Sequence, residues 1–116
     1  MTIEEDILLR VYESETFSSW LRKLKDAKAK AQIEKQIHRI KVAEAYVGDW
    51  KPIGGGIVEI RIDSGPGYRL YTVMECRKLL ILLAGGTKQS QSRDIAAAKR
   101  ELMKWRRLND GTSTGF

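Results

Sequence analysis

Residues 57–84 constrain the fold of this chain more than any other stretch. Apolar and polar side chains alternate along residues 58–63 and again along 68–74, which is typical of strands with one buried face. A Ser-Gly-Pro-Gly sequence at 64–67 separates the two runs and suits a tight turn. Residues 79–84 are apolar without interruption, so we expect an interior strand that is covered on both faces. Because the connections are short, the sequence predicts an antiparallel meander.

The chain before this meander is predicted to form one strand and two helices. Residues 7–12 are rich in β-branched and aromatic side chains and indicate a first strand. Apolar side chains then recur at helical spacing over residues 17–24 and over roughly residues 27–46. Ser14 or Thr16 and then Asp26 are the expected N-caps of these helices.

The remaining segments complete an α+β prediction. Residues 49–56 contain a proline and three consecutive glycines, so we expect a loop. A last helix begins at Ser90 or Ser92 and carries an apolar stripe, and residues 109–116 are expected to be a disordered tail. The predicted fold is one domain over residues 1–108, with the order strand, two helices, three antiparallel strands, helix, and with helices covering the sheet.

Composition narrows the classes of partner and site. The 116 residues carry a net charge of +6, which favours a polyanionic partner such as nucleic acid or an acidic protein. One cysteine, Cys76, excludes an intrachain disulfide, and one cysteine with one histidine excludes the usual Cys/His zinc site, so we expect no metal and no cofactor. The acidic start of the chain and its short apolar runs predict a cytoplasmic protein without a membrane segment.

The turn at 64–67 also predicts the pairing of the two strands around it. A turn centred on Gly65 keeps the apolar side chains on one face and sets Arg61 opposite Arg69 and Glu59 opposite Tyr71. Like charges directly opposed destabilise a sheet. Either Glu59 and Asp63 neutralise the arginines, or a phosphate lies between the two guanidinium groups.

Further polar residues follow the last strand and extend this candidate site. Lys88 comes directly after a predicted break at Gly85-Gly86, from which it reaches the same concavity. A groove with several cations and tyrosines suits single-stranded RNA, because charge holds the backbone and aromatic rings stack on bases. The predicted RNA-binding residues are Tyr68, Gln89, Gln91 and Arg93.

Several of these segments together resemble a known family. EIRI at 59–62, GPGYRLY at 65–71 and LLAGGTKQ at 82–89, followed by Asp94, Ile95 and Ala98, resemble the RelE/ParE superfamily of toxins. Within it they are most similar to the HigB-like branch of phage-derived addiction module killer proteins. The resemblance covers roughly residues 7–105 and implies the same order of strands and helices.

The resemblance implies the toxin of a type II toxin–antitoxin pair. Such toxins bind in the ribosomal A site and cut messenger RNA by attack of a 2′-hydroxyl on the neighbouring phosphate, without a metal. By this resemblance Arg69 contacts the scissile phosphate, Lys88 is the basic residue after the last strand, and Arg61 and Tyr71 complete the catalytic set. The implied partners are the ribosome, its message and a cognate antitoxin, either an acidic or a helix-turn-helix protein, in a hetero-oligomer.

Proton transfer is where the sequence departs from the family. Several members carry a tyrosine or histidine near the start of the last helix, whereas this chain has Ser92-Arg93-Asp94-Ile95. Tyr71, Tyr68 and Asp94 are the candidate substitutes. The ParE relatives share the fold and inhibit DNA gyrase without cutting RNA, so that function remains an alternative, as does a basic interaction domain without toxicity.

Overall fold

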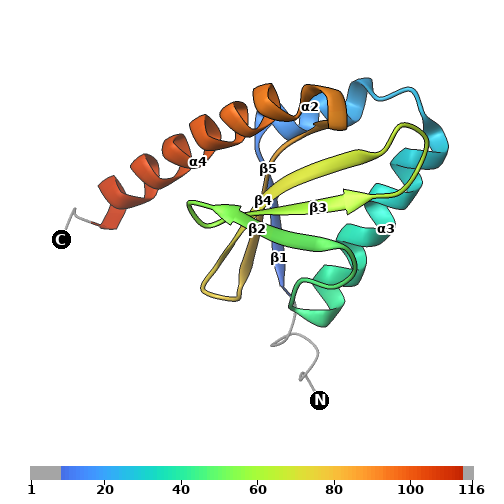
Figure 1. The fold of residues 1–116 in the computed structure, drawn as a ribbon. Coiled ribbons are helices and arrows are strands. Elements are labelled where there is room, and N and C mark those ends of the chain that lie inside the picture. Colours follow the sequence, from blue (N-terminus) through green and yellow to red (C-terminus); the bar gives the residue numbers. More distant parts are fainter. Residues whose placement is uncertain (1–8, 114–116) are drawn as a thin grey trace, which may run out of the picture.

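The computed structural model describes residues 9–113, and the side chains of residues 9–109. The protein is α+β, with a five-stranded mixed sheet covered by helices on both faces (Figure 1). The strand order is β1-β5-β4-β3-β2, in which β2 to β5 form an antiparallel meander and β1 pairs with β5 in parallel. The strands are β1 (Arg10–Glu13), β2 (Trp50–Gly54), β3 (Ile57–Ile62), β4 (Tyr68–Glu75) and β5 (Leu79–Thr87).

The predicted caps of the first two helices are confirmed. The hydroxyl of Ser14 accepts a hydrogen bond from the Phe17 N–H at 3.0 Å, and the Asp26 carboxylate accepts one from the Ala29 N–H at 3.0 Å. These side chains satisfy backbone donors that a helix start otherwise leaves free. The helical elements are α2 (Glu15–Lys23), α3 (Ala27–Ala43), a short 3₁₀ turn η1 (Lys88–Ser90) and α4 (Gln91–Ser113).

The loop predicted at residues 49–56 is wrong, because most of it forms strand β2 at the edge of the sheet. Pro52 lacks an N–H, but an edge strand needs hydrogen bonds on only one side and tolerates this loss. The glycines form the end of β2 and the turn into β3, and Gly54, Gly55 and Gly56 all have positive φ angles of 103°, 66° and 85°. The meander therefore has four strands rather than the predicted three.

Strand β5 is longer than predicted and holds both helical layers close to the sheet. The expected break at Gly85-Gly86 is wrong, since β5 continues through both glycines to Thr87. A Cβ atom at Gly85 would collide with the Trp20 ring of α2, and one at Gly86 would collide with the Asp94 carboxylate of α4. The two glycines thus let α2 and α4 approach the same strand. The expectation that this strand is buried on both faces is confirmed.

Each face of the sheet has its own hydrophobic core. Helices α2 and α3 pack on one face, against Ile60, Ile62 and Leu70, whereas α4 packs on the other face, against Tyr71 and Val73. Because side chains alternate along a strand, neighbouring residues of β3 and β4 enter different cores. Figure 1 shows α4 starting over the end of the sheet and running beyond it.

The two ends of the chain bear on three predictions. Strand β1 begins at Arg10, so residues 7 and 8 of the predicted first strand lie outside the described residues. Helix α4 continues to Ser113, into the segment expected as a tail, and residues 114–116 lie outside the described residues. The boundary at residue 108 stays a prediction. None of the helices within residues 9–113 is long and apolar enough to cross a membrane.

Candidate RNA-binding site

The hairpin of β3 and β4 has the predicted register. Arg61 lies opposite Arg69, and Glu59 lies opposite Tyr71. The turn at 64–67 closes with a hydrogen bond from the Gly67 N–H to the Ser64 carbonyl at 2.9 Å. Two arginines are thus held side by side on adjacent strands, at the end of the sheet where β5 passes into η1.

One groove contains the three cations that the sequence assigned to phosphate contact. Arg61, Arg69 and Lys88 line a hollow of about 240 Å³ beside the 64–67 turn; we call it the arginine groove. Asp49 and Asp63 also line it and bring carboxylates close to these cations. The three residues assigned to phosphate contact therefore do lie together, although β3, β4 and η1 contribute one each.

Arg69 is paired within the protein. Its Nη1 lies 2.9 Å from Oε2 of Glu59, whose side chain is 0% exposed, while the Arg69 side chain keeps 15% exposure. A hydrogen bond between two charged groups at this distance is stronger than one between neutral groups. The pairing of Glu59 with an arginine, one of the two explanations open from the sequence, is confirmed for Arg69.

Arg61 is paired at the surface, and its partner differs from the one expected. Its Nη2 lies 3.0 Å from the carboxylate of Asp49, with side-chain exposures of 36% and 61%, and its backbone N–H donates to the Asp49 carbonyl at 2.8 Å. The expected pairing with Asp63 is not the ion pair that the structure shows. The loop before β2 brings Asp49 alongside β3, a contact that the strand alternation alone does not reveal.

Tyr71 is inside the protein rather than in the arginine groove. Its ring is fully buried in the core under α4, and its hydroxyl lies 3.5 Å from Oε2 of Glu59. Burial, and then the negative charge of Glu59, raises the pKa of the Tyr71 hydroxyl far above its ordinary value. This correction removes Tyr71 from the candidate catalytic residues, because a substrate in the groove does not reach it.

Tyr68 lines the groove but belongs to the opposite core. It is 6% exposed, packs against Trp20 with ring centroids 6.2 Å apart, and donates its hydroxyl proton to Asp26 at 3.2 Å. Burial, and then the hydrogen-bonded Asp26 carboxylate, raises the pKa of Tyr68. The Tyr68 ring therefore has too little exposed surface for the expected stacking on an RNA base.

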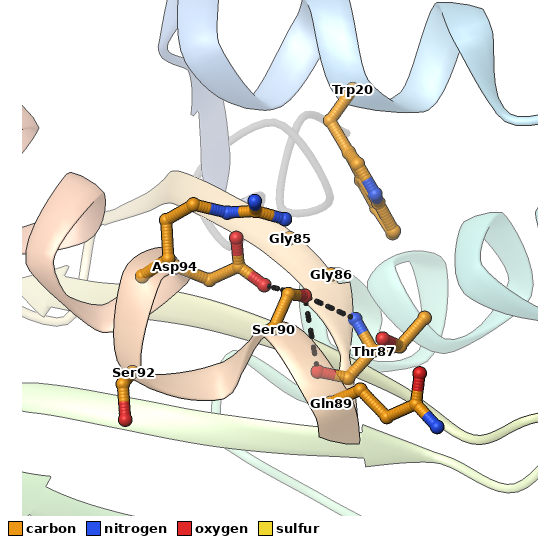
Figure 2. A pocket seen from close by; sticks show the side chains of 9 residues that line it. Trp20, Gly85, Gly86, Thr87, Gln89, Ser90, Ser92 and Asp94 are labelled. Atoms are coloured by element: carbon orange, nitrogen blue, oxygen red, sulfur yellow. Dashed lines mark hydrogen bonds between the residues drawn. The ribbon is translucent and has the colours of Figure 1, made fainter.

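The other predicted RNA-binding residues separate into two places. Gln89 and Arg93 line a second pocket of about 600 Å³ at the end of β5, under Trp20 (Figure 2). There the Ser90 hydroxyl accepts the Thr87 N–H at 3.1 Å and contacts the Asp94 carboxylate. Asp94 is thus engaged in this pocket rather than in the arginine groove. Gln91, at the start of α4, instead points to the protein interior, where its Nε2 donates to Oε2 of the buried Glu59 at 2.9 Å.

Sequence reasoning missed the central position of Glu59. It considered this carboxylate only as a counter-ion of the arginines on the polar face of the strand, whereas the residue is completely buried. The signal available in the sequence was the last helix, because a helix over the second face buries whatever that face carries. Within residues 9–113, no group of three or more His, Cys, Asp and Glu side chains is arranged to hold a metal ion.

Comparison with known proteins gives one sequence relative and a solved structure of the same fold. No protein-family profile matches the chain. An uncharacterized protein of Haemophilus influenzae is 48% identical over 84 residues, which are 72% of this chain and 83% of that protein. A mutant of the E. coli toxin RelE in the free state superposes with a TM-score of 0.64 and 18% identity, over 80% of this chain and 97% of RelE. The E. coli RelBE toxin–antitoxin complex gives a TM-score of 0.49 and 20% identity, over 68% of this chain and 95% of the matched chain.

Proposed function

Because this chain belongs to the same protein family as the Haemophilus influenzae relative and has the fold of RelE, we propose that it is the toxin of a type II toxin–antitoxin pair. We assign it to the HigB-like branch on the motifs around the β3–β4 turn and the end of β5. Its activity in this proposal is cleavage of messenger RNA on the ribosome. The activity is tested by induction in bacteria and by cleavage with purified ribosomes.

The observation that carries the proposal is the arginine groove. Attack of a ribose 2′-hydroxyl on the adjacent phosphate adds negative charge to the phosphate oxygens before the 5′-oxygen leaves. Guanidinium groups match the geometry of phosphate oxygens and stay charged at every working pH. Arg69 and Arg61 on adjacent strands, with Lys88 at the same hollow, would hold the phosphate and stabilise that charge.

The proton-transfer groups in this proposal come from the groove itself. With Tyr71 buried and Tyr68 bonded to Asp26, the titratable side chains that line the groove beside the arginines are Lys88, Asp49 and Asp63. Asp49 is engaged by Arg61, whereas Asp63 is exposed. We therefore assign proton transfer to Asp63 and Lys88.

A second candidate function is inhibition of DNA gyrase without RNA cleavage. The observation that favours it is the position of the two tyrosines, since neither presents a free hydroxyl to the groove. The single histidine, His38, lies on α3 in a different pocket, beside Val42. A fold that binds a polyanionic or acidic surface needs the cations of the groove but no acid or base.

Induction of the protein in bacteria separates these functions. Cleavage predicts growth arrest, with messages cut at positions in phase with codons when their 5′ ends are mapped by primer extension. Gyrase inhibition predicts growth arrest with intact messages and an SOS response, and unimpaired growth would leave the basic interaction domain as the remaining function. The matched variants are Lys88→Gln, in the groove, and Lys28→Gln, on the exposed side of α3.

A protein partner is part of the proposal. An antitoxin encoded next to the toxin, either acidic or of the helix-turn-helix type, would form a hetero-oligomer and neutralise a chain with a net charge of +6. Co-expression with the product of the adjacent gene should restore growth and yield a complex that purifies together. Growth arrest that persists in the presence of that product would exclude it as the antitoxin.

A further inference from the structure

Glu59 is a buried charged group for which the proposed cleavage has no direct use. Its side chain is 0% exposed, and it lies in β3 on the face that α4 covers. Removing a carboxylate from water is energetically costly unless close hydrogen-bond donors and opposite charges compensate for the lost hydration. A carboxylate at this position therefore needs partners that hold it in place.

Three donors converge on one oxygen of Glu59. Oε2 accepts from Arg69 Nη1 at 2.9 Å, from Gln91 Nε2 at 2.9 Å and from the Tyr71 hydroxyl at 3.5 Å. The raised pKa of Tyr71 keeps its hydroxyl protonated and able to donate. Oε1 has no hydrogen-bond partner among the side chains and backbone that the structure describes. One carboxylate of β3 thus connects β4 with the first turn of α4.

The consequence for Arg69 is a fixed orientation. A guanidinium group is planar and carries five N–H donors, so a contact at Nη1 sets the direction of the others. Arg69 keeps 15% side-chain exposure and lines the arginine groove, while its Nη1 contacts the fully buried carboxylate of Glu59. A freely rotating arginine loses rotamer entropy when it binds a ligand, and the contact with Glu59 already restricts that freedom in Arg69.

We propose that Glu59 is a positioning residue, which holds the Arg69 guanidinium from inside the protein so that its remaining donors form a fixed fork for phosphate oxygens in the groove. Glu59 also cancels the net charge of Arg69, so Arg69 contributes directed hydrogen bonds more than long-range attraction. The role in cleavage rests on the proposed function, whereas the restraint on Arg69 does not. Two experiments separate these parts.

The first experiment measures the restraint without any RNA. In ¹⁵N NMR spectra the Nη–H signals of Arg69, assigned by their loss in Arg69→Lys, should be individually resolved because rotation about the guanidinium bonds is slow. The half-exposed Arg61 should give averaged signals and serves as the internal comparison. In Glu59→Gln the Arg69 signals should also average. Averaged Arg69 signals in the unmodified protein would overturn the proposal, and this comparison decides even if Glu59→Gln does not fold.

The second experiment measures the catalytic consequence. Single-turnover cleavage of a ribosome-bound message by Glu59→Gln should be slower by on the order of tenfold to a hundredfold, because the fork is misaligned. Affinity for a ribosome carrying a non-cleavable, 2′-deoxy message should stay within about twofold, since no phosphate donor has been removed. In an Arg69→Lys background the same substitution should change the cleavage rate by less than about threefold, since both act through one group.

The outcomes of the second experiment distinguish the possible failures. Equal rate losses in both backgrounds, an unchanged rate, or a loss confined to affinity would each overturn the positioning role. If the unmodified protein leaves the message intact, the proposed function fails, and the NMR comparison alone then decides whether Glu59 restrains Arg69.

Discussion

Arg61 and Arg69 lie directly opposite each other on adjacent strands, yet their surroundings differ. Arg69 is paired with a carboxylate that is 0% exposed, at 2.9 Å, whereas Arg61 is paired at 3.0 Å with Asp49, which is 61% exposed. The two distances are nearly equal. The difference lies in how much water surrounds each pair, and water decides what an ion pair contributes to stability.

This comparison shows that one site combines two kinds of cation. Arg69 is oriented from inside the protein and cannot be removed without leaving a buried charge. Arg61 is paired with an exposed carboxylate at the rim, so we expect it to serve function with little effect on stability. The following predictions test that difference, from the largest expected effect to the smallest.

The largest effect is expected for Arg69→Ala. Removing the arginine leaves Glu59 buried without its counter-ion, which typically destabilises a protein by about 3–5 kcal/mol. We therefore expect Arg69→Ala to be less stable than the unmodified protein. If Arg69 were only a surface phosphate ligand, as the sequence alone suggests, the fold would be unaffected. Urea unfolding followed by circular dichroism measures the change.

The control for this prediction replaces the whole pair. Glu59→Leu with Arg69→Met fills a similar volume without buried charge, and such replacements are often neutral or stabilising by about 1–4 kcal/mol. We expect this double variant to regain the lost stability while cleavage stays abolished. A double variant as unstable as Arg69→Ala would show that the charge of Glu59 is not the cause.

A smaller effect is expected from alkaline pH through Tyr71. Above the ordinary tyrosine pKa of about 10 the unfolded chain loses the phenolic proton, while the folded protein, with its raised pKa, keeps it. The folded state then binds more protons than the unfolded state. The contribution of Tyr71 to the free energy of unfolding is therefore fully present below pH 10, and the free energy falls by at most about 1.4 kcal/mol per pH unit above it. Urea unfolding of the protein and of Tyr71→Phe at pH 8 and at pH 11 should show the smaller loss in Tyr71→Phe. Equal losses would contradict the burial of this hydroxyl.

The smallest effect on stability is expected for Arg61→Ala. Exposed ion pairs contribute roughly 0–1 kcal/mol, and salt screens them further. Thermal unfolding at low and at high salt should therefore give nearly the same melting temperature for Arg61→Ala and the unmodified protein. Toxicity on induction should fall in the variant. A stability loss comparable to that of Arg69→Ala would remove the contrast between the two arginines.

The register and the grouping of cations could be predicted from the sequence. Ile60, Ile62 and Leu70 must share one face of the hairpin, which excludes registers shifted by one residue. A turn centred on Gly65 meets this condition and places Arg61 opposite Arg69. Lys88 was placed in this group from a break at Gly85-Gly86 that does not exist; it lies there because β5 continues through both glycines and ends beside β4. These are local properties of strands and turns.

What the strand pattern alone did not reveal depends on elements that meet only in the fold. The burial of Glu59 and Tyr71 follows from α4 lying across the second face, and the choice of Asp49 over Asp63 follows from the loop that leads into β2. Strand β2 itself was missed because its proline and glycines are disfavoured inside a sheet, although an edge strand accepts them. Propensity describes the segment, whereas pairing with β3 decides its structure.

The most direct test of the central claim is cleavage in a purified system. Ribosomes carrying a defined message are mixed with the purified protein, and the 5′ ends of the message are mapped over time. We expect a cut within the A-site codon that Arg69→Lys slows by on the order of a hundredfold, as loss of one contact to a charged transition state does. A message that stays intact beside folded protein would contradict the claim that the arginine groove cuts RNA.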